Sequence, residues 1–278
     1  MPCVRVNDIM MYYEVHGDRG SAVVLIHGYH CSKADWPKSL VSRMATAHRI
    51  VIFDNRGVGQ TDKPTTPYSM AQFAGDVVGI MDALNIQAAH IFGISMGGMI
   101  AQHVALSYPE RVLSLVLGST APGEPGGLFP VNPSQEVLVA LSKPSSGDRA
   151  QDERDGWLIV YTRPFIEGNR ALLESQLMDT LAYPEAPAYA LNLQLEAIST
   201  THDTLHRLGE IRQPTLIQAG LEDVLIPAGN SKILAERIPN ARLIEYPSAA
   251  HGYLDEAAPA AVDDILAFLA EVDAGKTR

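Results

Sequence analysis

Cysteine, basic residues and long apolar runs are all scarce in this chain of 278 residues. Only Cys3 and Cys31 occur, which excludes a framework of disulfides, and their spacing fits no metal site. The 21 basic residues are outnumbered by 32 acidic ones, so the net charge is −11. This charge argues against binding to nucleic acid, because neutralising phosphates requires a basic surface. It also provides no attraction to anionic lipids.

No segment has the features that carry a chain into or across a membrane. The apolar runs fall well short of the length needed to span a bilayer. The N-terminal sequence has no basic start followed by an apolar core, so we do not expect a secretory signal. We therefore expect a cytoplasmic protein that acts on a small molecule, with no nucleic acid, membrane or cofactor as partner. The oligomeric state is left open.

Short apolar runs alternate with helical patterns along most of the chain. A hairpin over residues 4–15 precedes the first continuous run. Continuous runs are typical of strands buried in a parallel sheet. Strands alternating with helices predict a mostly parallel, doubly wound α/β sheet. The predicted strands are 22–26, 50–53, 91–94, 112–117, 215–219 and 242–246, and the helices between them are 70–84, the segment after 95, 231–238 and 257–272.

The alternation stops between residues 122 and 209, a segment that opens with a loop rich in proline and glycine. We interpret residues 122–209 as a helical cap, or lid, inserted into an α/β core formed by residues 1–121 and 210–278. Ligands of open α/β sheets bind beyond the carboxyl ends of the strands, so we expect the cap to lie over that edge. The helical patterns within the cap are 136–142, 155–162, 169–180 and 188–208.

The segment Gly93-Ile94-Ser95-Met96-Gly97-Gly98 is the most informative motif in the chain. It matches G-x-S-x-G between a predicted strand and a predicted helix, a turn that lifts the serine hydroxyl clear of the sheet. The following helix points its N-terminal N–H groups at the serine, where they stabilise negative charge. Ser95 is therefore the candidate nucleophile for acyl transfer. The alternative is a plain turn in which Ser95 is a helix N-cap.

A serine nucleophile needs a base and an orienting acid, and two later loops contain them. Asp223 follows the fifth predicted strand, whereas the loop after the preceding strand contains no carboxylate. Glu222 is its neighbour and is expected to point elsewhere. His251 follows the last predicted strand. The order Ser95, Asp223, His251 is the one expected for a triad built on a G-x-S-x-G turn.

The loop after the first parallel strand is the candidate oxyanion hole. It reads His27-Gly28-Tyr29-His30, and the glycine lets the backbone turn toward the serine. We expect the N–H groups of Tyr29 and Met96 to bind the oxyanion together. His27 is predicted to bond its own loop, and His30 is a candidate substrate contact.

Two other clusters resemble ligand sites but are assigned structural roles. The glycine-rich loop at 54–61 fits no phosphate-binding pattern, so Asp54 and Arg56 are expected to satisfy backbone groups of a tight turn. His202 and His206 have helical i, i+4 spacing. They lack a third ligand and the H-E-x-x-H glutamate, so no metal site is expected.

Trp157, Tyr161 and Phe165 fall on one helical face of the predicted cap. Such a stripe is often core, but under a cap it equally lines an acyl or alkyl pocket. We keep all three as candidate substrate-binding residues and leave the core interpretation open.

Five short motifs stand at the loops where chemistry is expected: His27-Gly28, Asp54-x-Arg56-Gly57-x-Gly59, Gly93-x-Ser95-x-Gly97-Gly98, Gly220-x-x-Asp223-x-x-x-Pro227 and His251-Gly252. With these motifs the chain resembles the α/β-hydrolase family over nearly its whole length. Serine at position 95 disfavours the epoxide hydrolases and dehalogenases of that family, which use aspartate there. The overall pattern is similar to small carboxylesterases and enol-lactonases.

The first hypothesis is a serine hydrolase that cleaves a carboxylic ester or lactone through an acyl-enzyme. Ser95 attacks the carbonyl, His251 transfers the proton, and Asp223 orients His251. One alternative is a C–C bond hydrolase of a vinylogous diketone, although relatives with that activity often carry an aromatic residue where this chain has Gly252. The other alternative is a ligand-binding member of the family with little turnover. The sequence does not predict the identity of the substrate.

Overall fold

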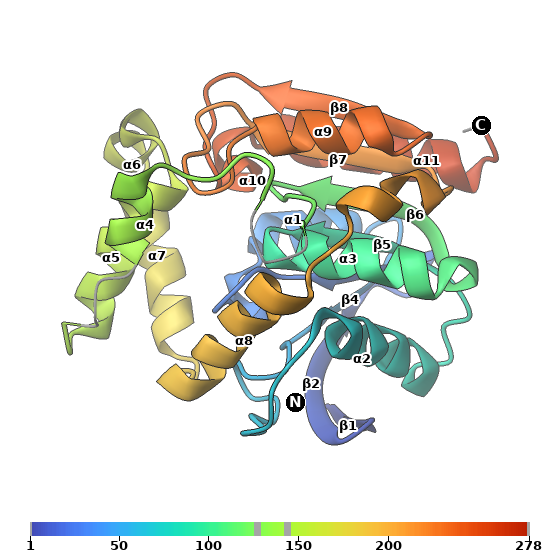
Figure 1. Cartoon of the computed structure of the whole chain (residues 1–278), viewed down its shortest axis with the longest axis horizontal. Helices are drawn as coiled ribbons and strands as arrows, with labels where there is room; N and C mark the ends of the chain where they lie inside the picture. Colours follow the sequence, from blue (N-terminus) through green and yellow to red (C-terminus); the bar gives the residue numbers. More distant parts are fainter. Residues whose placement is uncertain (1, 125–128, 142–145, 277–278) are drawn as a thin grey trace.

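The computed structural model describes residues 2–124, 129–141 and 146–276 (Figure 1). Its centre is an eight-stranded sheet in the order β1-β2-β4-β3-β5-β6-β7-β8. β1 and β2 form an antiparallel hairpin, β2 pairs antiparallel with β4, and all later neighbours are parallel. The predicted mostly parallel sheet is confirmed. The strands are β1 (Cys3–Val6), β2 (Ile9–His16), β3 (Ala22–Ile26), β4 (Arg49–Phe53), β5 (Ala89–Ile94), β6 (Val112–Gly118), β7 (Thr215–Gly220) and β8 (Ala241–Tyr246).

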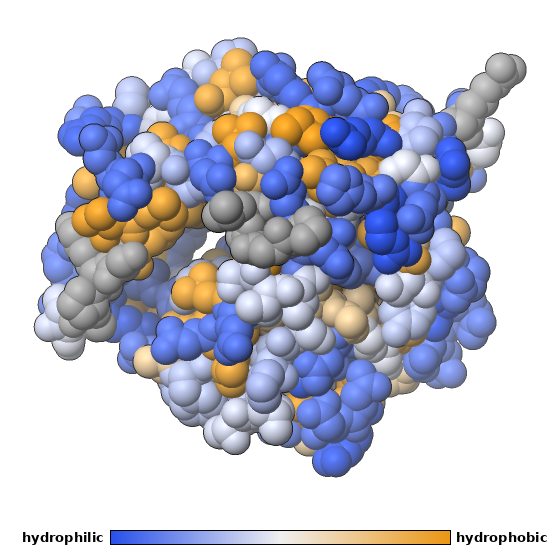
Figure 2. All heavy atoms as spheres, in the orientation of Figure 1, coloured by the Kyte–Doolittle hydropathy of each residue, from blue (hydrophilic) through white to orange (hydrophobic). Residues whose placement is uncertain are grey.

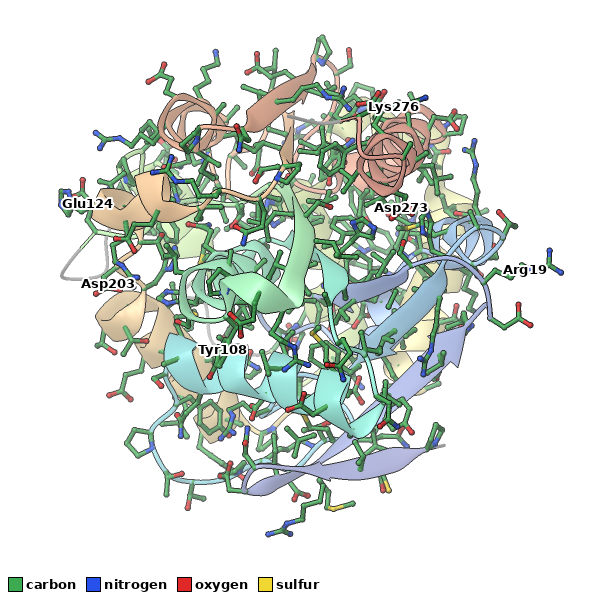
Figure 3. The ribbon with its side chains drawn as sticks, turned by 90° about the vertical axis from the view of Figure 1, so that its right-hand side faces the viewer. Arg19, Tyr108, Glu124, Asp203, Asp273 and Lys276 are labelled. Carbon is green, nitrogen blue, oxygen red and sulfur yellow. The ribbon has the colours of Figure 1, made fainter. Side chains whose placement is uncertain are left out.

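Alternate residues of each strand pack on opposite faces of the sheet, as the period-two geometry of a strand requires. In β3, Val24 and Ile26 join one buried cluster, while Val23 and Leu25 join another. The first cluster contains side chains of α2, α3 and α9, and the second contains side chains of α1 and α11. Figure 3 shows α2 and α3 on one side of the strands and α11 on the other. These helices are α1 (Lys38–Met44), α2 (Met70–Ala83), α3 (Met96–Ser107), α9 (Gly229–Arg237) and α11 (Ala260–Asp273).

The helices between β6 and β7 form an insertion beside the sheet. In Figure 1, α4 to α7 stand together at one end of the molecule, and α8 leads back to the core. Trp157, Leu173 and Leu177 are the buried centre of this group. By contrast, Ala197 of α8 belongs to the main core, so the last helix of the insertion is built into the core. The helices are α4 (Gln135–Leu141), α5 (Arg149–Val160), α6 (Arg163–Gly168), α7 (Arg170–Leu181) and α8 (Ala188–Thr201).

The end of the insertion differs from the sequence prediction. The helix predicted over 188–208 ends at Thr201, because the backbone of His202 is extended. A short 3-10 helix, η3 (Leu205–Glu210), follows. The short helices α1 and α6 are not predicted from the sequence. The cap boundaries at 122 and 209 stay a prediction.

The longest helices among the described residues are α2, α8 and α11, each with 14 residues. At 1.5 Å per residue such a helix is about 21 Å long, shorter than the ~30 Å hydrocarbon core of a bilayer. Within the described ranges, no helix therefore has the length and hydropathy that crossing a membrane requires.

Candidate active site

Ser95 occupies the sharp turn between β5 and α3 that its motif predicts. Its backbone has φ 57° and ψ −126°, a conformation that costs a residue other than glycine about 1–3 kcal/mol. Its N–H donates to Gly118 O at 2.9 Å, and its carbonyl accepts from Thr120 Oγ1 at 2.7 Å. A Cβ on Gly97 would collide with Ile26 O, so only glycine lets α3 start this close to β3. The Ser95 side chain forms no cap hydrogen bond, which leaves its hydroxyl available for chemistry.

His251 and Asp223 meet in the loops that follow β8 and β7. The distance from His251 Nδ1 to Asp223 Oδ2 is 2.8 Å, and both side chains are buried. The other carboxylate oxygen, Oδ1, accepts the backbone N–H groups of Leu225 at 2.9 Å and Ile226 at 2.8 Å. These two donors orient the carboxylate. The carboxylate in turn favours the tautomer of His251 with its proton on Nδ1, which leaves Nε2 as a base.

Ser95 and His251 border the same loop, the one that follows β3. A Cβ on Gly28 of this loop would lie 3.4 Å from Ser95 Oγ. The adjacent His27 interacts electrostatically with His251, and burial lowers the pKa of His27. In the described parts of the chain, the Ser95 hydroxyl and the His251 ring form no hydrogen bond with each other; the ring bonds Asp223 instead. Catalytic hydrogen bonds are often long without ligand and tighten when substrate binds.

The backbone N–H groups of Tyr29 and Met96 have no acceptor among the described residues. Met96 is the first residue of α3. An N–H at this position has no partner within the helix and lies at the positive end of the helix dipole. His27 Nδ1 accepts the N–H of Gly28 at 2.8 Å, which confirms that His27 bonds its own loop. Two unpaired N–H groups on the loops that border Ser95 are what binding an oxyanion requires.

Known proteins match this chain over almost its whole length. It is 30% identical over 273 residues to a protein of Azorhizobium caulinodans named as the carbamate hydrolase RutD, and the match covers 98% of this chain and 100% of the relative. A family model described as the alpha/beta hydrolase fold matches residues 21–149. The chain belongs to the α/β-hydrolase family.

Other relatives of this α/β hydrolase carry different activities in their names. A non-heme chloroperoxidase of Streptomyces lividans is 31% identical, with 93% of this chain and 95% of the relative covered. The crystal structure of an enol-lactonase from Burkholderia xenovorans LB400 has a TM-score of 0.82 at 26% identity, with 97% of this chain and 100% of that chain covered. The resemblance and the fold predicted from the motifs are confirmed. Because the names differ in chemistry, family membership leaves the substrate open.

The glycine-rich loop after β4 has the expected structural role for Asp54 but not for Arg56. The Asp54 carboxylate accepts two backbone N–H groups, at 2.7 and 2.8 Å, and closes the turn. Arg56 instead binds the carboxylate of Asp76 at 2.6 and 2.9 Å, and that of Asp8 at 2.9 Å. The prediction for Arg56 is therefore wrong. A buried guanidinium needs an anionic partner more than a carbonyl, and α2 supplies one.

The cap holds the His251 loop through a carboxylate that sequence reasoning missed. Glu256 ends the short helix α10 (Tyr253–Glu256). Its Oε1 accepts the N–H and the hydroxyl of Thr162, each at 2.8 Å. Its Oε2 accepts the N–H of Ala250 at 2.5 Å. Glu256 therefore links the residue before His251 to the cap. In the sequence, this role is indicated only by the presence of a carboxylate shortly after the histidine.

We expect Glu256→Gln to lower kcat by about tenfold with a smaller change in KM. The amide keeps one acceptor oxygen, so one of the two linked segments loses its charge-assisted hydrogen bond and His251 is positioned less well. Steady-state kinetics on an ester substrate measure the effect, with Glu110→Gln at an exposed position as the control. A lower melting temperature with unchanged kcat would show that Glu256 only stabilises the fold.

The aromatic stripe predicted on one helix of the cap is divided between two helices, which corrects that prediction. Trp157 lies on α5, Tyr161 lies beyond its end with extended backbone, and Phe165 lies on α6. The cause is Pro164. Proline has no N–H to donate, and its ring clashes with the carbonyl four residues earlier, so α5 cannot continue through it.

The three aromatic residues consequently have different surroundings. Trp157 is 9% exposed in the centre of the cap, which favours the core interpretation for it. Tyr161 lies against the loop after β8: its hydroxyl donates to Asp255 Oδ2 at 3.0 Å, and a Cβ on Gly252 would collide with its ring. Phe165 stacks on Tyr161 at 5.3 Å. Tyr161 is therefore the member of the stripe that borders the candidate catalytic histidine.

His30 lies where the candidate oxyanion loop contacts α8. Its backbone has φ 70°, and its N–H donates to Gln194 Oε1 at 3.2 Å. The amide nitrogen of Gln194 donates to Arg56 O at 2.9 Å. This buried glutamine was not predicted, and it joins the loops after β3 and β4 to the insertion.

His202 and His206 have separate environments. His202 is buried, with its Nδ1 3.2 Å from His103 Nε2 on α3 and its Nε2 3.0 Å from Ala121 O. His206 is exposed on η3. Burial lowers the pKa of His202 to about 3 and that of His103 to about 4. The structure thus gives His202 a packing role between α3 and the end of the insertion.

Because the pKa values of His202 and His103 are lowered, we predict that the stability of the protein falls as the pH drops from 7 to 5. Both rings stay neutral in the folded protein, whereas in the unfolded chain they take up protons near pH 6.5. Protonation therefore favours unfolding. The contribution of the two neutral rings to the free energy of unfolding is fully present above pH 6.5 and is lost as the pH falls below it. For His202 the expected loss at pH 5 is about 2 kcal/mol. Thermal unfolding from pH 5 to 8 should be less pH-dependent in His202→Gln, and an equally steep dependence would contradict the assignment.

Proposed function

We propose that this α/β hydrolase is a serine hydrolase that cleaves a carboxylic ester or lactone through an acyl-enzyme. The observation that carries the proposal is the 2.8 Å hydrogen bond between His251 Nδ1 and Asp223 Oδ2. It supports a general base in the loops at the same sheet edge as the strained Ser95. The two unpaired N–H groups of Tyr29 and Met96 add support for an oxyanion hole.

In the acylation step, Ser95 Oγ attacks the carbonyl carbon while His251 Nε2 takes the hydroxyl proton. Asp223 remains ionised and stabilises the imidazolium. The N–H groups of Tyr29 and Met96 donate to the oxyanion, and each donor lowers the barrier by about 3 kcal/mol. His251 then protonates the leaving alkoxide, which in a lactone stays attached to the acyl group.

In the deacylation step, His251 acts as base again. It takes a proton from water, and the hydroxide attacks the acyl carbonyl. The same two N–H groups stabilise the second oxyanion. The bond between Ser95 Oγ and the acyl carbon then breaks, His251 returns the proton to Oγ, and the carboxylic acid is released.

The surface supports access to this site from between the cap and the core. Figure 2 shows a hollow there, with apolar residues gathered beside it over α4. Leu138, Val139 and Leu141 of α4 are 41%, 57% and 50% exposed. If substrate enters through this hollow, as we propose, the apolar residues beside it favour a substrate with a hydrocarbon portion.

Covalent labelling combined with a substrate panel tests the proposal. We expect a fluorophosphonate to label Ser95, as located by peptide mass spectrometry, and at least one class of ester or lactone to be turned over. Labelling with negligible steady-state hydrolysis would indicate a ligand-binding protein instead. Faster turnover of a vinylogous diketone than of any ester would indicate C–C bond hydrolysis. Absence of labelling at Ser95 would remove the basis of the proposal.

A further inference from the structure

The cap contacts the loop of the candidate catalytic histidine through three consecutive residues. Residues 160–162, which we call the cap strap, join the end of α5 to the start of α6. The carbonyl of Val160 in the strap accepts the N–H of Gly252, the residue after the histidine, at 2.8 Å. At the other end of the strap, Thr162 binds the Glu256 carboxylate, which also accepts the N–H of the residue before the histidine. The cap strap therefore holds the chain on both sides of the candidate base.

The core holds the same loop two residues before the histidine. There the N–H of Glu222 donates to Ala249 O at 2.9 Å, and Asp223 binds the His251 ring itself at 2.8 Å. The backbone of His251 thus lies between a contact made by the core and one made by the cap. A shift of the cap strap would move the imidazole relative to Asp223 and Ser95, which belong to the core. A misplacement of roughly 1 Å in a catalytic group can cost about 10²-fold in rate.

The middle residue of the cap strap, Tyr161, occupies the space that a side chain at position 252 would need. Gly252 has φ −80° and ψ 31°, a conformation that residues other than glycine also adopt in turns. A Cβ on Gly252 would nevertheless collide with the Tyr161 ring, whose atoms are the nearest to that position. The ring of Tyr161, rather than the backbone, therefore explains the glycine after the candidate base.

Tyr161 is itself held on its edge and on its face. Its hydroxyl donates to Asp255 Oδ2 at 3.0 Å, and the Phe165 ring stacks on its ring with 5.3 Å between the centroids. Gln176 of α7 donates to the other oxygen of the same carboxylate, Asp255 Oδ1, at 3.1 Å. Two side chains of the cap thus bind one carboxylate of the core. The Tyr161 ring is consequently a fixed spacer between the cap and the histidine loop.

We propose that Tyr161 is a positioning residue for His251. Its ring packs against Gly252 and sets the distance between the cap strap and the loop, so the imidazole is in place only while the cap is docked. A catalytic group needs such support, because its geometry must be held by neighbours that packing has already fixed. The inference rests on the proposed hydrolase function, and it makes the cap part of the scaffold of the general base.

A cycle of variants at positions 161 and 252 tests the proposal. Gly252→Ala places a methyl group against the ring, and Tyr161→Ala removes the ring. We expect each variant to lower kcat on an ester by about tenfold, with KM changed by less than about threefold. In the double variant the methyl group has the space that the ring left, so kcat should stay within about threefold of Tyr161→Ala. Tyr161→Phe keeps the ring and should retain kcat within about threefold of wild type.

The chain offers a matched control for each substitution. Tyr189 joins the cap to the core elsewhere, where its hydroxyl donates to Lys63 O at 2.8 Å. A Cβ on Gly156 of α5 would meet nothing within 4 Å. Tyr189→Ala and Gly156→Ala should therefore retain wild-type kcat, with thermal unfolding as the check on folding. Gly252 is also the N-cap of α10, where alanine is less favourable than glycine, but this cost is present with and without the ring and cancels in the cycle.

Three kinetic results would overturn the proposal. If the two losses multiplied to about 100-fold in the double variant, Gly252 would not act through Tyr161. If Tyr161→Ala lowered the melting temperature and left kcat unchanged, the ring would only stabilise the fold. If the change were confined to KM and varied along a panel of esters, Tyr161 would be a substrate-binding residue instead.

A proton NMR measurement separates this inference from the proposed function, because it needs no turnover. The proton between His251 Nδ1 and Asp223 Oδ2 should give a low-field resonance that is absent from His251→Ala. We expect Gly252→Ala and Tyr161→Ala to lose or broaden this resonance, and Tyr161→Phe to keep it. Ester turnover with an unchanged resonance and unchanged kcat in Gly252→Ala refutes the positioning role alone. Loss of the resonance in a protein that neither hydrolyses esters nor reacts with a fluorophosphonate supports the positioning role and refutes the hydrolase function.

Discussion

Replacing Ser95 with alanine is expected to lower kcat on short p-nitrophenyl esters by roughly 10⁴-fold or more. The variant keeps the backbone N–H groups proposed to bind the oxyanion but has no hydroxyl to form the acyl-enzyme. Alanine has nearly the same backbone preferences as serine, and the Ser95 hydroxyl caps no helix. We therefore expect the melting temperature to change little. Steady-state kinetics and thermal unfolding of the purified variant measure the two effects.

Ser69 provides the control for this substitution. It is the N-cap of α2, where its hydroxyl accepts the Gln72 N–H at 3.2 Å. Ser69→Ala should cost about 1 kcal/mol of stability and leave kcat unchanged. If instead Ser95→Ala destabilised the protein and retained near wild-type turnover, Ser95 would be a structural turn residue and the proposed function would be wrong.

Replacing Asp223 with asparagine is expected to lower kcat by about 10⁴-fold. The Leu225 and Ile226 N–H groups both donate to Oδ1, so the amide oxygen of the asparagine must take that position. Its NH2 group then faces His251 Nδ1 and donates to it. This forces the ring proton onto Nε2, and the nitrogen that should accept the serine proton is already protonated. Kinetics on the same esters measure the loss.

Glu222 is the matched control because it is the adjacent carboxylate in the same loop and is exposed. Glu222→Gln should retain wild-type kcat. The opposite pattern, with activity lost in Glu222→Gln and retained in Asp223→Asn, would show that the orienting acid has been assigned to the wrong residue.

Strand positions and the meeting of Asp223 with His251 could be predicted because they depend on local features. The run 22–26 coincides with β3, since a strand buried on both faces must be apolar throughout. Loops that follow neighbouring parallel strands emerge at one edge of the sheet. Two chemistry-bearing residues in the loops after β7 and β8 must therefore lie close together, although 28 residues separate them.

Side-chain partners between distant elements could not be predicted in this way. Arg56 binds Asp76, which is 20 residues away, and Gln194 binds Arg56 O across 138 residues. Neither separation corresponds to a helical or strand period. The break between Tyr161 and Phe165 is different, because Pro164 is a local signal for it that was available in the sequence.

By itself, the sequence determined that this chain forms a mostly parallel α/β sheet with a helical insertion, and it determined the order of Ser95, Asp223 and His251. Apolar periodicity and turn residues act over a few positions, so they can be read locally. Only the tertiary structure decided that Trp157 is cap core and that Glu256 links the loop before His251 to the cap. Those outcomes depend on which helix ends and backbone groups pack against each side chain, and packing partners are set by the whole fold.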